Sequence, residues 1–295
     1  MRILPSITLL AATLLAGCVT VTAHGDPARA GFGPPPPNDT LNATVWYQRA
    51  LERDLVYAEV YRSAGRMLDA ALADAHWDAL PRGDRDNADA LGTLPAAIIV
   101  DVDETVLDNS AHQARMIRDR TEFSDGSWDA WVQQRAAPAL AGAVAFLDGA
   151  ADKGVTVFYV SNREVAQAEA TVANLRAAGF PIRDASQFLG KGTPVEGCEG
   201  KASDKGCRRE LIGRSYRVLM QVGDQLGDFL DIPANTPEGR RSALVPYAGW
   251  VGERWWVLPN PVYGSWEPAQ FGNDWSQDAG ARRAAKEAAL EDLRP

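Results

Sequence analysis

One stretch decides the fold: Ala96-Ala-Ile-Ile-Val-Asp101-Val-Asp103-Glu-Thr105. A short apolar run rich in β-branched residues, ending abruptly at charged residues, is typical of a buried strand in a parallel sheet. Ligands of open α/β sheets bind just beyond the carboxyl ends of such strands. Carboxylates are costly to bury there unless a metal ion or a proton compensates their charge. Asp101 and Asp103 therefore indicate a functional site, although an acidic turn that caps a helix would look the same on this stretch alone.

The composition is that of an acidic chain with ample apolar residues for a core. Its 295 residues are enough for one large domain or two small ones, with a formal net charge of −9 and a pI of about 4.9. This charge gives no indication of a nucleic-acid groove or of binding to an anionic membrane surface. We therefore expect small-molecule partners and no nucleic-acid polymer.

The N-terminus has the layout of a secretory signal. Met1-Arg2 precede an apolar run from Ile3 to Ala16, which is too short for a stable transmembrane span. The run ends Leu15-Ala16-Gly17-Cys18, which resembles a bacterial lipobox and implies that Cys18 is lipid-modified; a plain signal with a chance Cys is the alternative. We expect residues 1–17 to be a lipoprotein signal peptide and 18–38, which end in a Pro run, to be a lipid-anchored tether.

Cys198 and Cys207 lie nine residues apart in a loop rich in Gly and Lys. In an exported protein, one close pair of Cys most simply forms a disulfide. A metal site is the less favoured alternative, because two thiols are too few ligands and the loop contains no His.

The chain alternates helical and strand patterns. Buried strands are predicted at 96–100, 155–160, 217–222 and 254–260. Helical patterns are predicted at about 41–72, 111–140, 144–154, 166–178 and 206–213, with a loop at 184–205 and a surface helix or tail from 279 to 295. This alternation argues for an α/β fold with a mostly parallel, doubly wound sheet flanked by helices.

Polar side chains follow three of these strands. They are Asp101 and Asp103, Ser161 and Asn162, and Asp224 and Asp228. Because the carboxyl ends of parallel strands meet at one edge of the sheet, we expect these groups to converge.

This set of side chains suits phosphoryl transfer. A hard cation such as Mg²⁺ binds carboxylates, so Asp101 and Asp224 can supply ligand oxygens while leaving positions for a phosphoryl oxygen. Asp101 can act as the nucleophile, forming an aspartyl-phosphate, and Asp103 as general acid and then base. Ser161 and Lys205 would hold the oxygens of the transferring phosphate.

At this point the sequence resembles a known family. Asp101-Val-Asp103-Glu-Thr105 is similar to motif I of the haloacid-dehalogenase (HAD) superfamily of phosphohydrolases, Ser161 to motif II, Lys205 to motif III, and Asp224 with Asp228 to motif IV. The stretches 101–110, 158–163 and 222–229 more narrowly resemble the class C acid phosphatases, lipid-anchored bacterial outer-membrane enzymes that include 5′-nucleotidases. The resemblance implies a HAD-like phosphatase domain at 39–278, with a mostly helical cap at about 39–90 and 111–140.

The resemblance also assigns roles to residues. It implies that Asp101 is the nucleophile and that Asp103 is the acid/base, whose main-chain carbonyl binds Mg²⁺. It makes Asp224 a metal ligand and Asp228 a ligand through water or a support behind the ligands. Ser161, Asn162 and Lys205 would bind phosphate, with Lys201 an alternative to Lys205 that the spacing Lys205-x-x-Arg208 disfavours. Trp128 and Tyr263 are similar to aromatic residues that sandwich a nucleobase or aromatic leaving group.

We therefore expect a Mg²⁺-dependent acid phosphatase of nucleoside 5′-monophosphates and aryl phosphates at the bacterial cell envelope, anchored in the outer membrane. The alternatives are a non-catalytic surface lipoprotein that binds nucleotides or haem, and a phosphotransferase of the same superfamily. The pattern leaves the oligomeric state open, with a dimer as one option.

Overall fold

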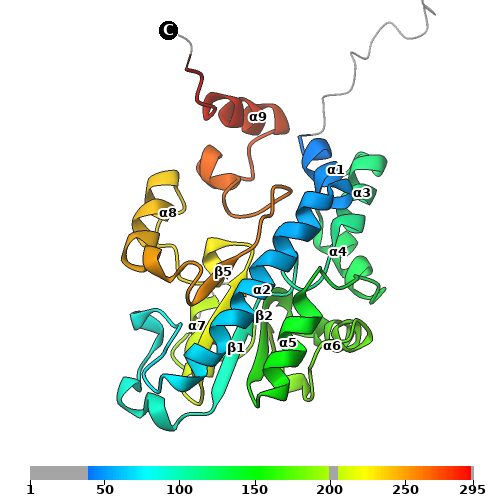
Figure 1. Cartoon of the computed structure of the whole chain (residues 1–295). Helices are drawn as coiled ribbons and strands as arrows, with labels where there is room; N and C mark the ends of the chain where they lie inside the picture. The colour runs from blue at the N-terminus through cyan, green and yellow to red at the C-terminus, as the bar shows by residue number, and fades with distance from the viewer. Residues whose placement is uncertain (1–38, 199–204, 294–295) are drawn as a thin grey trace, which may run out of the picture. The chain divides into compact units, whose positions relative to one another are not determined.

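The computed structural model describes residues 39–198 and 205–293. They form a five-stranded parallel sheet in the order β3-β2-β1-β4-β5 (Figure 1). The strands are β1 (Ala96–Val100), β2 (Thr156–Glu164), β3 (Phe188–Lys191), β4 (Arg217–Gly223) and β5 (Trp255–Val257). The order reverses beside β1, which pairs with β2 on one side and β4 on the other, so the central strand ends at the switch point where α/β sheets bind ligands. The predicted parallel α/β sheet flanked by helices is thus confirmed.

β1 is a strand because both of its faces are buried. Successive side chains of a strand point to opposite faces, so Ile98 and Val100 join one apolar cluster while Ala97 and Ile99 join another. This two-sided burial explains why the run is continuously apolar instead of alternating.

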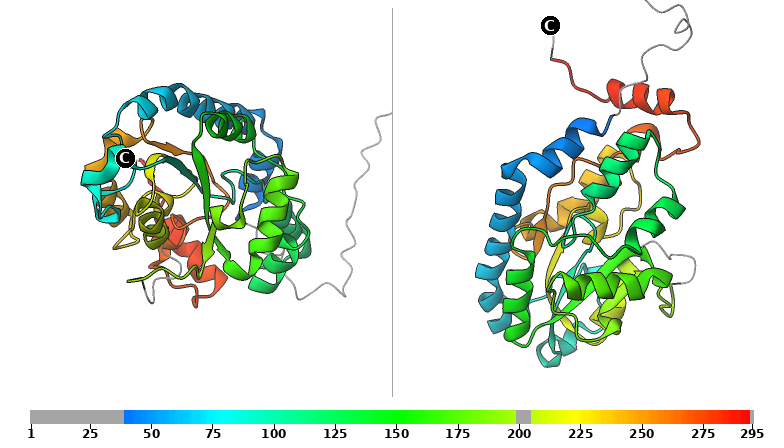
Figure 2. Two further views of the ribbon diagram at one scale, coloured as in Figure 1. Left: turned by 90° about the horizontal axis from the view of Figure 1, so that it is seen from below. Right: turned by 90° about the vertical axis from the view of Figure 1, so that its right-hand side faces the viewer.

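The first face of the sheet is covered by α2 (Leu51–Ala73), α5 (Ala143–Asp152) and α6 (Ala168–Ala177). α2 and α5 lie side by side (Figures 1 and 2). The buried residues of α2 recur at intervals of three or four and form one apolar stripe: Tyr57, Tyr61, Ala64, Leu68 and Ala71. α2 also contacts β4 and β5, so it belongs to the helix layer of the sheet, and the boundaries of a helical cap at 39–90 and 111–140 stay a prediction.

The second face is covered by α7 (Lys205–Gly213) and by segments without long helices. Ile212 of α7, Phe229 and Trp255 pack there, with the last two ring centroids 5.4 Å apart.

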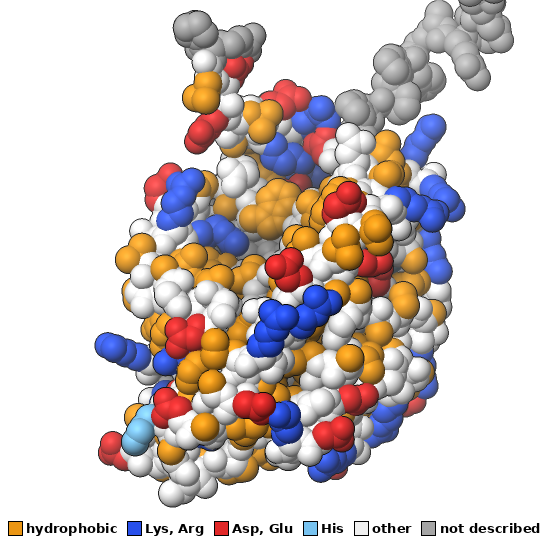
Figure 3. Space-filling view, viewed as in Figure 1, with side chains coloured by type: hydrophobic (Ala, Val, Ile, Leu, Met, Phe, Trp, Pro, Cys, Tyr) orange, Lys and Arg blue, Asp and Glu red, His pale blue; other side chains and the backbone are white. Residues whose placement is uncertain are grey.

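The remaining helices are α1 (Leu41–Arg49), α3 (Ser110–Asp119), α4 (Asp125–Val132), α8 (Pro237–Leu244) and α9 (Ala279–Ala288). Short 3₁₀ turns are η2 (Arg82–Asp84), η3 (Ala88–Thr93), η4 (Val165–Gln167), η5 (Ala185–Gln187), η6 (Leu226–Asp228), η7 (Val245–Trp250) and η8 (Pro268–Phe271). No helix within 39–198 and 205–293 is long and apolar enough to cross a membrane. The face shown in Figure 3 carries acidic and basic side chains interspersed.

Two predicted boundaries are wrong in ways that matter for the site. The predicted loop at 184–205 contains β3, whose apolar signal is limited to the buried Phe188 and Leu189 before Gly190; pairing with β2 supplies the rest of its stability. The strand predicted to end at residue 160 continues to Glu164, so Ser161, Asn162 and Arg163 lie within β2 and not beyond it.

Other differences are smaller. α8 has no counterpart in the predicted helices, because none of its residues is buried and it leaves no apolar stripe in the sequence. β5 is only three residues long, not the seven of 254–260. The predicted signal peptide, the tether with Cys18, and Lys201 lie outside the described residues.

Candidate active site

Asp101 occupies the end of the central strand. Its amide donates to the carbonyl of Val222 at 2.9 Å, which continues the β1–β4 ladder by one residue, and its side chain is buried. The backbone of the sheet therefore fixes where this carboxylate lies.

Three carboxylates meet at this edge, and we call Asp101, Asp224, Asp228 and Lys205 the metal corner. One oxygen from each of Asp101, Asp224 and Asp228 lies within 4.8 Å of the others. Two amide nitrogens, Nδ2 of Asn260 and Nε2 of Gln225, each donate to Asp224 Oδ2 at 2.8 Å. The amides leave the other oxygen of Asp224 available to a ligand.

Lys205 supplies the positive charge of the metal corner. Its ammonium donates to Asp101 Oδ1 and pairs with Asp228 Oδ1 at 2.7 Å, and all three side chains are 7% exposed. Asp228 also accepts from the backbone amide of Gln225 at 2.8 Å, which closes the turn η6 after β4. The sequence-based choice of Lys205 thus agrees with its position beside Asp101.

The charges of the metal corner are not balanced. Burial raises the pKa of Asp101 to about 7; Lys205 opposes this effect, while Asp228 and Asp103 add to it. Burial likewise raises the pKa of Asp224 well above its usual range, with Asp228 and Asp101 adding. Burial lowers the pKa of Lys205, but the two aspartates outweigh it and the net shift is upward. Three carboxylates held by one ammonium favour the addition of further positive charge.

Asp103 lies in different surroundings, which we call the acid corner: Asp103, Asn109, Ser161 and Arg163. Arg163 donates to Asp103 Oδ1 from Nη2 at 2.7 Å and from Nε at 2.9 Å. Nδ2 of Asn109 donates to the same oxygen at 2.8 Å, and the Ser161 hydroxyl donates to Oδ2 at 3.2 Å. One carboxylate is thus matched by one guanidinium and two neutral donors.

The alternation of β2 explains which of its residues reach the acid corner. Ser161 and Arg163 are buried and point to the same side of the strand, whereas Asn162 between them is exposed. Oδ1 of Asn162 accepts from Arg208 Nη2 at 2.7 Å. The structure brings Ser161 to Asp103, and it gives the Asn162 side chain a partner other than the carboxylates.

The predicted stacking residues both contact motif residues. Trp128 lies on α4, and the guanidinium carbon of Arg163 is 5.5 Å from its ring centroid. The ring centroid of the exposed Phe123 lies 6.3 Å from the ring centroid of Trp128. The Tyr263 hydroxyl donates to Glu104 Oε2, and its carbonyl accepts from Gln225 at 3.3 Å.

With this geometry established, the comparisons with known proteins identify the family. A family model described as HAD superfamily, subfamily IIIB (Acid phosphatase) matches residues 48–266. The chain belongs to this family.

A solved structure supports the assignment to the class C acid phosphatases. The class C acid phosphatase from Bacillus anthracis superimposes with a TM-score of 0.74 and 30% identity, covering 86% of this chain and 98% of that one. A second structure of the same protein, with tungstate bound, matches equally well.

Two plant proteins are more distant relatives of this HAD acid phosphatase chain. "Acid phosphatase 1" of Solanum lycopersicum is 27% identical over 165 residues, and a "Stem 31 kDa glycoprotein" of Glycine max is 27% identical over 132. The matches cover 56% and 45% of this chain, and 57% and 51% of the relatives, so the chain spans about half the length of the plant proteins it matches.

Sequence reasoning assigned no role to three residues of the acid phosphatase site. Arg163 lies past the apolar run that predicts β2, so the sequence does not place it within a strand. Asn260 orients Asp224, and it is the last residue of the strand predicted at 254–260, where a polar side chain at the carboxyl end is the signal that could have found it. Glu104 is 1% exposed; its Oε1 accepts from the amide of Asn109 at 2.7 Å, and its carbonyl accepts from the Tyr57 hydroxyl at 2.6 Å. Burial raises the pKa of Glu104 well above its usual range.

Proposed function

We propose that this chain is an acid phosphatase that hydrolyses phosphomonoesters through an aspartyl-phosphate formed on Asp101. One observation carries the proposal: the Asp101 carboxylate is buried at the switch point of the sheet, where Lys205 and two further aspartates surround it. A nucleophile in such a place is shielded from water and lies beside a cationic group that can hold phosphoryl oxygens. The tungstate in the Bacillus anthracis relative, a tetrahedral oxyanion like phosphate, supports the same reading.

The residues of the metal corner fit a hard divalent cation, and we propose Mg²⁺. The fit rests on an all-oxygen donor set from Asp101, Asp224 and Asp228, with ligand atoms within 4.8 Å of one another. By resemblance to the family, the main-chain carbonyl of Asp103 would join them. When bound, the cation supplies positive charge that neutralises the phosphate oxygens and the clustered carboxylates.

The chain's own residues account for the proton and bond changes. An Asp101 oxygen attacks phosphorus and the bond to the leaving oxygen breaks, while protonated Asp103 gives its proton to that oxygen. Water then attacks the phosphorus of the aspartyl-phosphate, Asp103 takes one proton from it, and the Asp101 carboxylate and phosphate are released. Lys205 and Ser161 would hold the phosphate oxygens. Asn162, which is exposed, would also bind the phosphate.

We propose nucleoside 5′-monophosphates and aryl phosphates as substrates. Trp128 and Phe123 form a partly exposed aromatic surface beside Arg163, which contacts Asp103. The resemblance adds Tyr263, whose hydroxyl donates to Glu104. Flat rings bind any base by stacking, which favours broad specificity among aromatic leaving groups.

We also propose that the enzyme is lipid-anchored at the cell envelope, in the outer membrane, through Cys18. The support is the signal-like run Ile3 to Ala16 followed by the lipobox-like Leu15-Ala16-Gly17-Cys18. Palmitate labelling and membrane fractionation of the full chain test the anchor, since Cys18→Ala should abolish both labelling and membrane recovery.

The enzyme proposal is tested by phosphate release from p-nitrophenyl phosphate and AMP by protein lacking residues 1–18, with Mg²⁺ and with EDTA. Turnover that requires the cation and disappears in Asp101→Asn is the expected result. No turnover by the wild type would overturn the proposal in favour of a binding lipoprotein. Transfer of phosphate to an added alcohol in preference to water would point instead to a phosphotransferase.

A further inference from the structure

The N-terminal turn of α7 determines where the Lys205 side chain lies. Lys205 is the first residue of α7, and its ammonium lies between Asp101 and Asp228. A hydrogen bond from an ammonium to a carboxylate is lost when the atoms separate by about an ångström. The first turn of α7 must therefore be held firmly for Lys205 to reach the phosphate.

Two buried guanidinium groups hold this part of α7, one against the sheet and one against neighbouring loop segments. Arg208 donates from Nη1 to the carbonyls of Ser161 and Leu189, which lie on β2 and β3. Arg209 donates to Asp84 Oδ2 at 2.6 Å and to Asp231 Oδ1 at 3.0 Å.

Gly206 shows how closely the turn approaches Asp231. A Cβ added at Gly206 would lie 2.4 to 2.7 Å from the atoms of the Asp231 carboxylate, so a larger residue would require this carboxylate to move away from its partner Arg209. The first turn of α7 therefore lies directly against Asp231.

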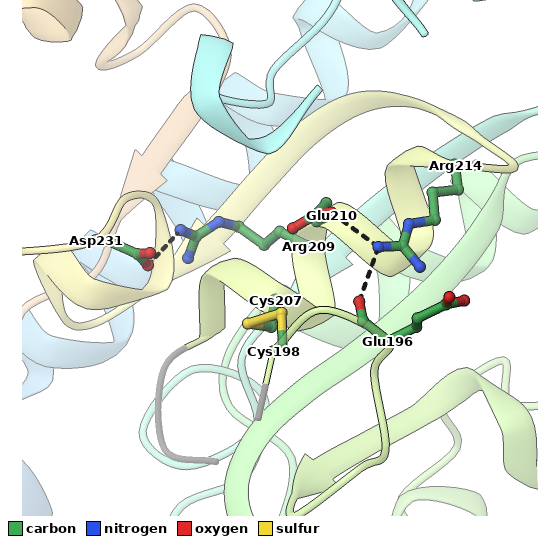
Figure 4. The surroundings of a disulfide bond; sticks show 7 residues. All are labelled: Glu196, Cys198, Cys207, Arg209, Glu210, Arg214 and Asp231. Carbon is green, nitrogen blue, oxygen red and sulfur yellow. Dashed lines mark hydrogen bonds and ion pairs between the residues drawn. A yellow bond between two sulfur atoms is a disulfide. The ribbon is translucent and has the colours of Figure 1, made fainter. Parts of the chain in front are cut away.

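The disulfide holds the turn by a separate link. Cys207 on α7 is bonded to Cys198, which follows β3 by a short segment. The carbonyl of Glu196 in that segment accepts from Arg214 just beyond the last turn of α7 at 3.2 Å, so the segment lies along the helix. Figure 4 shows the disulfide and the Arg209–Asp231 pair at different sides of the first turn.

We propose that the Cys198–Cys207 disulfide positions Lys205 for the phosphatase reaction, in addition to stabilising the fold. The bond joins Cys198, in the segment after β3, directly to the first turn of α7. With the disulfide intact, the turn is held by Arg208, by Arg209 with the Gly206 contact, and by Cys207. Without it, only the contacts of Arg208 and Arg209 hold the turn, so Lys205 is held less firmly beside Asp101. This inference rests on the phosphate-binding role proposed for Lys205.

The test compares phosphate affinity with stability. The full chain is assayed with Mg²⁺ at a temperature well below the Tm of each variant. The Cys198→Ala/Cys207→Ala double variant should show an inhibition constant for orthophosphate raised about tenfold and a kcat lowered about tenfold. The matched control is Leu175→Ala, which removes a fully buried side chain of α6 and should lower Tm while leaving the inhibition constant unchanged. A disulfide that only stabilised the fold would make the two variants behave alike.

Lys205→Met separates this inference from the role proposed for Lys205. If Lys205→Met binds orthophosphate as tightly as the wild type, the proposed role of Lys205 fails. If Lys205→Met binds weakly but the double Cys variant binds normally, the positioning inference alone is overturned.

Reduction of folded wild type gives the same comparison should the double variant fail to fold. Dithiothreitol transfers two electrons and two protons to the S–S bond and is itself oxidised to a cyclic disulfide. Reduction is expected to raise the inhibition constant for orthophosphate by the same factor in the wild type and in Leu175→Ala. The two factors should agree because loss of the disulfide, and not loss of stability, causes the change. Unchanged affinity after complete reduction, checked by thiol titration, overturns the proposal.

Discussion

Asp101 and Asp103 are two residues apart on one loop, yet the metal corner and the acid corner are electrostatically opposite. In the metal corner, three buried carboxylates share the one ammonium of Lys205. In the acid corner, a single carboxylate, that of Asp103, accepts hydrogen bonds from the Arg163 guanidinium. The Asn109 amide and the Ser161 hydroxyl also donate to it. The first arrangement has more carboxylates than cationic groups, whereas the second pairs one carboxylate with one guanidinium.

The difference explains how one loop can carry two kinds of chemistry. A nucleophile must be ionised and free to attack, and the metal corner keeps Asp101 accessible to a phosphoryl group once its charge is balanced. A general acid must be held in place and exchange a proton at a defined position, and the acid corner orients Asp103 through three side chains. Asp101 still belongs to the β1–β4 ladder and contacts Lys205, whereas Asp103 lies beyond the ladder and contacts Arg163 of β2.

The largest effect should come from removing the nucleophile. Asp101→Asn keeps the shape of the side chain but not its nucleophilic oxygen, so kcat should fall by at least about a thousandfold. Steady-state turnover of p-nitrophenyl phosphate measures this, with circular dichroism to confirm folding. Retention of wild-type turnover would mean that the two corners have been assigned to the wrong roles.

Loss of the guanidinium should disturb the acid corner alone. Arg163→Met leaves Asp103 without its two charged donors, and kcat should fall about tenfold because the acid is no longer oriented. Arg163→Lys should restore only part of the rate, since an ammonium cannot form the paired contact. Arg135→Met, which breaks an exposed pair with Glu169, is the control and should leave kcat unchanged. Equal rates in Arg163→Met and wild type would show that Asp103 needs no orientation.

The unbalanced charge of the metal corner should appear in the pH dependence of stability. The pKa of Asp101 is raised to about 7 in the folded protein, and that of Asp224 is also raised, above the value near 4 of an unfolded aspartate. Their contribution is fully present below about pH 4 and is lost as the pH rises through about 7, so the Tm of the cation-free protein should fall between pH 5 and 8.

Added Mg²⁺ should reverse this loss. Because the cation binds ionised carboxylates, the increase in Tm on adding Mg²⁺ should be several degrees larger at pH 8 than at pH 5. Differential scanning fluorimetry with and without EDTA measures both effects, and equal increases at the two pH values would contradict them.

The smallest effect concerns the link between motif I and Tyr263. Tyr263→Phe removes a donor from the buried carboxylate of Glu104, which should lower the free energy of unfolding by about 1–3 kcal/mol. The stacking surface stays, so KM for aryl phosphates should change little. Urea unfolding followed by tryptophan fluorescence measures the first quantity, and a large loss of kcat would instead connect Tyr263 to the acid corner.

Much of the site could be predicted because its residues follow apolar strands. Asp101 and Asp224 both come directly after a buried run, and parallel strands bring their carboxyl ends to one edge. Asn162 and Arg163 could not be sorted in this way, because their roles depend on β2 extending four residues past its apolar part. That extension is stabilised by pairing with β3, whose own signal was too short to recognise.

The sequence alone predicted the parallel α/β fold and the approach of Asp101 to Asp224, which follow from local periodicity and from the geometry that all parallel sheets share. The choice of Lys205 followed from the resemblance of Lys205-x-x-Arg208 to the family's pattern. Only the tertiary structure decided that Arg163 binds Asp103, that Asn260 orients Asp224, and that Tyr263 is tied to Glu104. These contacts join side chains far apart in the chain, and no local pattern specifies them, because they depend on how strands, loops and helices pack at the same edge.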